Sequence, residues 1–205
     1  SRLDLLDGIL PARYIYATGG VVNIESRAGC VSPGGQVSVL FGQRDTFEPS
    51  VSYAGCAGET SYFVSGQYNQ GQNAFSSATP GPNPIHDRAN QGRLFGAIAT
   101  PLSATTTLRI ILSSVASNNQ LPNVPGLSPS FDLAGAPDPS SGAINSYLNF
   151  RDYLGMVTLS GTPTSDLRYH ITYAAHAISQ HFVPDRIGEL TFQGVSSTAS
   201  HDDVD

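Results

Sequence analysis

The sequence has no lysine and little charge of either sign. Charged residues make up 13% of its 205 residues, about half of the usual share. The net charge is −6 and arginine supplies every positive charge, so there is no basic surface of the kind that binds nucleic acid. Apolar runs such as residues 108–112 are far shorter than the roughly 20 residues of a membrane-spanning helix. These shortages exclude a nucleic-acid-binding protein and a helical membrane protein.

Cysteine is also scarce. Cys30 and Cys56 are the only two, which is too few for a disulfide scaffold, and their spacing is not that of metal ligands. They could form one bridge in an oxidising compartment, or they could be two small buried residues. The sequence leaves both alternatives open.

Motifs for enzyme chemistry are missing. No Gly-x-Ser-x-Gly, His-Glu-x-x-His, phosphate-binding loop or Cys-x-x-Cys occurs, so we expect no catalysis, no metal site and no cofactor. His170 and His176 share a strand face but lie about 20 Å apart at ~3.3 Å per residue, too far to hold one ion. His201, Asp202 and Asp203 are expected to form a solvated chain end rather than a site.

Glycine and proline are plentiful, with 21 and 14 copies, which is typical of an all-β chain. Turn-forming residues at 33–35 mark a boundary, beyond which apolar and polar residues alternate with a period of two. The clearest example is 167–176, while the faces of 90–101 do not resolve. Strands are predicted at roughly 35–42, 47–54, 58–69, 90–101, 105–117, 146–161 and 166–181.

The predicted connections differ in length in a regular way. After a hairpin at 43–46, those at 55–57, 102–104 and 162–165 are short, and those at 70–89 and 118–145 are long. Transmembrane barrels have short turns at one end and long loops at the other, whereas a soluble domain rarely carries a structureless loop beyond about 12–15 residues. The pattern favours part of an antiparallel transmembrane β-barrel, about seven strands, with long extracellular loops.

Aromatic residues fit that interpretation. Phe41, Phe47 and Tyr68 fall toward the long-loop ends of their strands, and Tyr53 and Tyr62 toward the short-turn ends. Rings at both membrane interfaces form the girdles of such barrels. The alternative is that strands of any kind favour aromatic residues.

Several segments, taken in order, resemble TonB-dependent outer-membrane receptors. Residues 5–14 (LLDGILPARY) and 18–24 (TGGVVNI) resemble the closing strands of the plug domain. The segments that resemble the early barrel are 34–37 (GGQV), 62–66 (YFVSG), 83–87 (NPIHD), 120–127 (QLPNVPGL) and 181–185 (HFVPD). The sequence departs from the family at Tyr14-Ile15-Tyr16, where family plugs often have glycine after the first tyrosine.

The resemblance implies residues 1–33 as the C-terminal part of a plug and 34–205 as the first part of the barrel. It implies a receptor in the outer membrane of a Gram-negative bacterium that takes up a scarce solute such as an iron chelate, glycan or peptide. Its partners would be outer-membrane lipid and TonB with the inner-membrane energising complex. The TonB box, the first part of the plug and most of a wall of 22 strands are absent from this chain, so we expect an excerpt or an incomplete gene product.

Four residues are candidates for the barrel lumen: Arg109, Arg168, His170 and His176. They could face the plug or line the substrate path, or they could be solvated interior residues of the kind any such barrel carries. Cys30 is expected at the junction of plug and barrel and Cys56 in the first short turn, both at the periplasmic end. Gly19-Gly20 is expected to form a tight plug turn or a bulge. The competing functions are a passive outer-membrane channel and a secreted β-sandwich that binds a ligand.

Overall fold

The computed structural model describes residues 2–6, 21–25, 29–72, 85–122, 124–131, 134, 140–188, 191–192 and 200–204. Strands β1 (Arg2–Leu6) and β2 (Val21–Glu25) form a small antiparallel sheet of their own. The predictions for Gly19-Gly20 and for Tyr14 lie outside the described residues. All the other strands belong to one large sheet.

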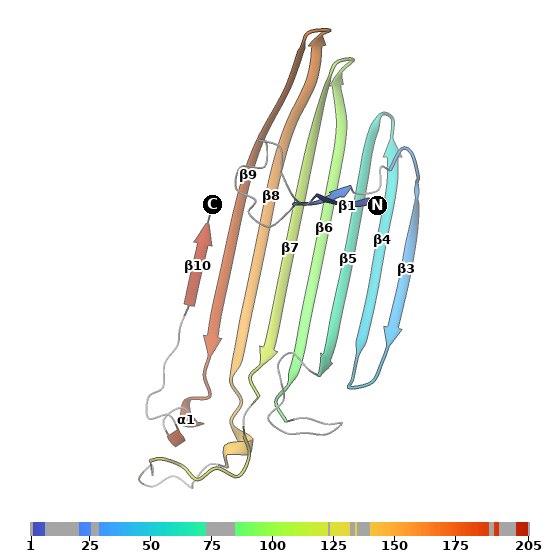
Figure 1. Ribbon diagram of the computed structural model, residues 1–205. Helices are drawn as coiled ribbons and strands as arrows, with labels where there is room; N and C mark the ends of the chain where they lie inside the picture. The colour runs from blue at the N-terminus through green and yellow to red at the C-terminus, as the bar shows by residue number, and fades with distance from the viewer. Residues whose placement is uncertain are drawn as a thin grey trace.

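The large sheet has eight strands whose order follows the chain, and each neighbouring pair is antiparallel (Figure 1). Its strands are β3 (Gly34–Phe41), β4 (Phe47–Ala57), β5 (Thr60–Gln72), β6 (Arg88–Ser103), β7 (Thr106–Gln120), β8 (Tyr147–Thr164), β9 (Leu167–Val183) and β10 (Ser200–Val204). The predicted all-β fold of antiparallel strands is confirmed. Each of the strands predicted between 35 and 181 is present, with ends that lie within three residues of the expected ones.

The expected position of Cys56 was wrong, and the sequence did not predict β10. Cys56 lies in β4 and not in a turn, because the strand continues to Ala57 and the turn is made by Gly58 and Glu59. Gly58 has a φ of 59°, the left-handed conformation that glycine adopts without strain. His201, Asp202 and Asp203 lie in β10, which pairs with β9, where a strand was not expected.

The connections sort by length onto the two ends of the sheet (Figure 1). Two-residue turns at 58–59, 104–105 and 165–166 lie at one end. The connections at 42–46, 73–87, 121–146 and 184–199 all leave the other end. Short helical turns occur there, at Ser141–Ala143 and α1 (Arg186–Gly188). We call the two ends the short-turn end and the long-loop end.

The large sheet is a single layer without a hydrophobic core. Ala54 is the only apolar residue that is buried among the residues whose side chains are described. The chain exposes 13608 Å², against roughly 9,200 Å² expected of a compact monomer of this mass. In the described part of the chain, β3 and β10 are the edge strands of the large sheet, and no strand pairs with their outer edges. The sheet is therefore open.

No helix among the described residues is long and apolar enough to span a membrane.

Candidate functional site

The register divides the large sheet into two faces of opposite character. One row of paired residues crosses it as Val37, Val51, Gly66, Leu94, Ser114, Tyr153 and Ala177. The next position on every strand faces the other way. That row reads Ser38, Ser50, Gln67, Arg93, Val115, Asp152 and Ile178. We call these the apolar face and the polar face.

Large hydrophobic side chains on the apolar face are open to the surroundings. Leu112, Ile171 and Tyr173 are 61%, 63% and 73% exposed. All large exposed hydrophobic residues of the large sheet, apart from Leu40 and Leu102, lie on this face. Water-soluble monomers rarely expose apolar patches beyond a few hundred Å². A face of this extent needs an apolar environment.

Every tyrosine on the strands of the large sheet lies on the apolar face. The set is Tyr53, Tyr62, Tyr68, Tyr147, Tyr153, Tyr169 and Tyr173. The rings of Phe41 and Phe47 are in tilted contact at the long-loop end, with centroids 5.3 Å apart, and those of Tyr53 and Tyr62 lie 6.1 Å apart nearer the short turns. A preference of strands for aromatic residues would place tyrosine on both faces. Phenylalanine does occur on both faces, since Phe63, Phe95, Phe150 and Phe182 lie on the polar one, so the one-sided placement holds for tyrosine alone.

A charge-free belt runs across the apolar face. On β9 it extends from Leu167 to Ala177, ten residue steps that span about 33 Å at ~3.3 Å each. A strand tilted by about 40° crosses roughly 25 Å over that length, which is the height of the apolar band of an outer-membrane barrel. Arg151 on β8 ends the belt toward the long loops.

The short turns climb along the sheet in equal steps. Thr60, just after the first short turn, is level with Leu108 on β7, and Thr106, just after the second turn, lies two residues nearer the short-turn end of that strand. Thr106 is in turn level with Tyr169 on β9. Leu167, just after the third turn, again lies two residues nearer the short-turn end. Two residues span about 6.6 Å and two strands about 9.6 Å. Turns at one common height therefore need strands tilted by roughly 35°, the tilt found in closed barrels.

The polar face holds the four residues predicted to face a lumen. Arg109, Arg168, His170 and His176 all lie on it. Glu48, Arg93 and Asp152 share this face. Charged residues within the strands avoid the belt and gather on this side of the sheet.

Two small networks order the polar face. His176 Nε2 lies 3.1 Å from Asp152 Oδ2 on the neighbouring strand. Nearer the short turns, the hydroxyls of Thr158 and Thr172 are 3.0 Å apart, and Thr172 contacts His170 at 3.2 Å. The two histidines thus belong to separate networks. No group of three or more metal-ligating side chains occurs in the described residues.

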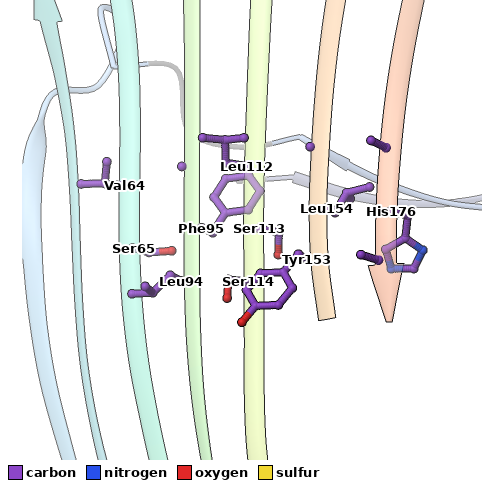
Figure 2. A pocket seen from close by; sticks show the side chains of 14 residues that line it. Val64, Ser65, Leu94, Phe95, Leu112, Ser113, Ser114, Tyr153, Leu154 and His176 are labelled. Carbon is purple, nitrogen blue, oxygen red and sulfur yellow. The ribbon is translucent and has the colours of Figure 1, made fainter. Parts of the chain in front are cut away.

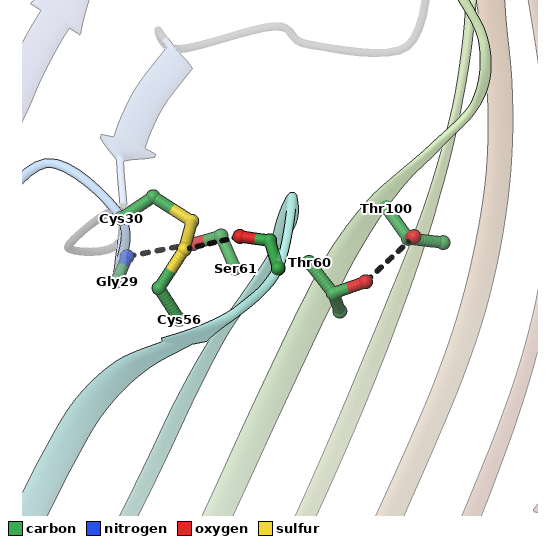
Figure 3. Close-up of a disulfide and its surroundings, with 7 residues drawn as sticks. Gly29, Cys30, Cys56, Thr60, Ser61 and Thr100 are labelled. Atoms are coloured by element: carbon green, nitrogen blue, oxygen red, sulfur yellow. Dashed lines mark hydrogen bonds between the residues drawn. A yellow bond between two sulfur atoms is a disulfide. The ribbon is translucent and has the colours of Figure 1, made fainter.

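A disulfide ties the segment before β3 to the polar face. Cys30 is bonded to Cys56, and the Gly29 N–H donates to Ser61 Oγ at 2.6 Å (Figure 3). Cys56 and Ser61 are paired residues of the polar face. A Cβ at position 29 would overlap the Gly55 carbonyl oxygen, so the backbone can approach this closely only because residue 29 is glycine. The chain therefore enters the sheet from its polar side.

An apolar strip crosses the polar face beside this tether. Ala54, Phe63, Ala97, Ile111 and Met156 form one paired row, and the rings of Phe63 and Phe95 are 5.9 Å apart. The large side chains of this row are half-buried. A wall that faced only water would not need such a strip, whereas a packed neighbour would use it.

The loops at the long-loop end are held together by one carboxylate. Asp185 accepts hydrogen bonds from the N–H of Asn145 (3.1 Å, to Oδ2) and of Gly188 (3.0 Å, to Oδ1). Its own N–H donates to Ser146 Oγ at 3.0 Å. Asp185 thereby joins the segment after β9 to the residues that lead into β8.

Replacing Asp185 with alanine should loosen these loops. Two half-buried N–H groups would lose their acceptor, which costs about 1–3 kcal/mol. We expect hydrogen exchange at Asn145 and Gly188 to accelerate by roughly tenfold or more. Asp166→Ala is the control, because that carboxylate is in a short turn and accepts from Ser165 Oγ. Unchanged exchange in Asp185→Ala would show that the carboxylate does not hold the loops.

No protein-family model, curated protein or solved structure matches this chain. Any functional proposal therefore rests on the two faces of the sheet, the disulfide tether and the loops.

Sequence patterns missed three features of this site. The faces of β6 are now resolved, with Leu94 and Ile98 on the apolar face and Phe95 and Ala97 on the polar one. The apolar strip escaped notice because it forms only when residues from many strands align. The part that Asp185 plays in the loops also depends on contacts across 39 and 40 residues, which no local pattern reports.

Proposed function

We propose that this chain forms part of the wall of an outer-membrane β-barrel, in a receptor of the TonB-dependent kind that takes up a scarce solute. The observation that carries the proposal is the uncharged belt of the apolar face, combined with short turns that climb at the slope of tilted barrel strands. Lipid is the environment in which such a face is stable. A closed wall would need further strands beside β3 and β10, since unpaired strand edges are costly in lipid.

The polar face would line the interior of the barrel. Arg93, Arg109, Arg168, His170 and His176 would be hydrated there or lie along the solute path. The long loops, held by Asp185, would be extracellular and make the first contact with the solute. The proposed solute is an iron chelate, a glycan or a peptide, and the proposal does not choose among the three.

The tether favours a plugged receptor over an open channel. The segment that precedes β3 approaches the sheet from the polar side, where Cys30 and Gly29 are fixed. The apolar strip beside it offers a packing surface for a plug domain. An open channel would need neither feature. A secreted β-sandwich is disfavoured because no second layer covers Leu167, Ile171 or Tyr173 in the described part of the chain.

Uptake measurements test the proposal. Cells with and without the gene for this protein would be compared on ferric chelates, oligosaccharides and peptides, each with and without a protonophore. We expect growth on at least one solute to require both the gene and the energised inner membrane. Gene-dependent uptake that survives the protonophore would instead assign a passive channel. No gene-dependent uptake, with the protein absent from the outer-membrane fraction, would reject both.

A further inference from the structure

Two hollows adjoin on the apolar face. The apolar hollow, of about 680 Å³, is lined by Leu94, Leu112, Tyr153 and the small residues Gly96 and Gly155 (Figure 2). The polar hollow, of about 400 Å³, begins two residues further along β6, β7 and β8 toward the long loops. It is lined by Tyr68, Asn90, Gly92, Ala116, Asn118, Asn149 and Arg151.

Glycines create both hollows. A Cβ at Gly92 or Gly96 would meet no atom within 4 Å, and one at Gly155 would make only an ordinary contact, 3.8 Å from Leu112 Cδ2. Packing within the chain therefore does not require glycine at these positions. Glycine inside a strand weakens it, and it often marks a place where a ligand approaches the backbone closely.

One hollow is apolar and the other is polar with a positive charge, as suits the acyl chain and the phosphate head group of a lipid. The apolar hollow offers the side chains of Leu94, Leu112 and Tyr153. The polar hollow offers three amides and the exposed guanidinium of Arg151, whose paired neighbours are the uncharged Ala116 and Ser179. Arg151 forms no ion pair with the described residues. A guanidinium and amides together suit a phosphate group.

We propose that a phosphate-bearing membrane lipid occupies both hollows, with an acyl chain over Gly96 and Gly155 and its phosphate against Arg151. This inference rests on the proposed function, in which the apolar face contacts lipid. The polar hollow lies where the charge-free belt ends toward the long loops, at the level expected for head groups. The bound lipid therefore belongs to the leaflet next to those loops.

Native mass spectrometry of the full chain in detergent, with phosphatidylglycerol as the probe, tests the site. We expect the wild type to retain one phosphatidylglycerol at a concentration where diacylglycerol, which has the acyl chains without the phosphate, is lost. Arg151→Gln should lower retention about tenfold, because a charge-assisted contact to the phosphate is removed. Gly96→Leu should lower it similarly by filling the apolar hollow, into which the new side chain fits without a clash at Cβ.

The controls are Arg93→Gln and Ala99→Leu, which make the same kinds of change on the polar face and should leave retention unchanged. Equal retention in all variants would overturn the site. A loss in Gly96→Leu alone would also overturn it, by showing an apolar occupant without phosphate. A dimer that Gly96→Leu abolishes would assign the hollow to a second copy. Lipid contact along the whole face with no effect of these variants would reject this site while leaving the proposed function intact.

Discussion

Arginine in place of Leu112 should destabilise the protein in a bilayer by about 2–4 kcal/mol, the cost of a charge near the midplane of a barrel wall. Leu112 lies on the apolar face and is 61% exposed. At such an exposed position in a soluble protein, the same substitution changes the free energy of unfolding by about 0.5 kcal/mol at most. The large effect arises only if hydrocarbon surrounds the side chain. Urea titration of the protein folded into vesicles gives the free energy of unfolding.

The matched control is Ser113→Arg, which places the same charge one residue further along β7, on the polar face. It should change the free energy of unfolding far less, because the interior of a barrel is hydrated. Similar small effects for both variants would mean that water, and not lipid, covers Leu112. Similar large effects would mean that both sides of the sheet are shielded from water.

Removal of the Cys30–Cys56 bond should cost about 3.5 kcal/mol of unfolding free energy, since the bond closes a loop of 26 residues and restricts the unfolded chain accordingly. The variant is Cys30→Ser combined with Cys56→Ser, compared with the oxidised wild type by the same urea titration. The reduced wild type should match the variant. Its intact mass should exceed that of the oxidised protein by the mass of the two thiol hydrogens.

The structural effect of removing the disulfide should also be confined to its surroundings. Hydrogen exchange at the Gly29 N–H, which donates to Ser61 Oγ, should accelerate in the double variant, while the amides of β8 and β9 stay protected. An unchanged free energy of unfolding and an unchanged Gly29 amide would contradict the tether. The hydrogen bond alone would then hold the segment against the polar face.

The strands and the lengths of their connections were predictable from the sequence, because both are local properties. Leu167, Tyr169, Ile171 and Tyr173 alternate with polar residues, and this pattern predicts that one face of β9 is apolar. The alternation of short and long connections places them at opposite ends of the sheet as soon as neighbouring strands are assumed to pair as hairpins. The pairing of Cys30 with Cys56 stayed open, because it depends on where the segment before β3 runs.

Features that depend on register were not predictable. The mixed composition of residues 94–99 hid the two faces of β6 until β5 and β7 fixed them. The hollows depend on Gly92, Gly96 and Gly155 coming together on two strands far apart in sequence. The pairing of β10 with β9 was missed because His201, Asp202 and Asp203 have low strand propensity.

Tryptophan scanning of β9 tests the central claim most directly, since the chain has no tryptophan of its own. Single tryptophans at each position from 168 to 175 would be quenched by brominated acyl chains after reconstitution into vesicles. We expect strong quenching at Tyr169, Ile171, Tyr173 and Ala175, and weak quenching at Arg168, His170, Thr172 and Ala174. Quenching that is absent or equal on both faces would contradict a lipid-facing wall.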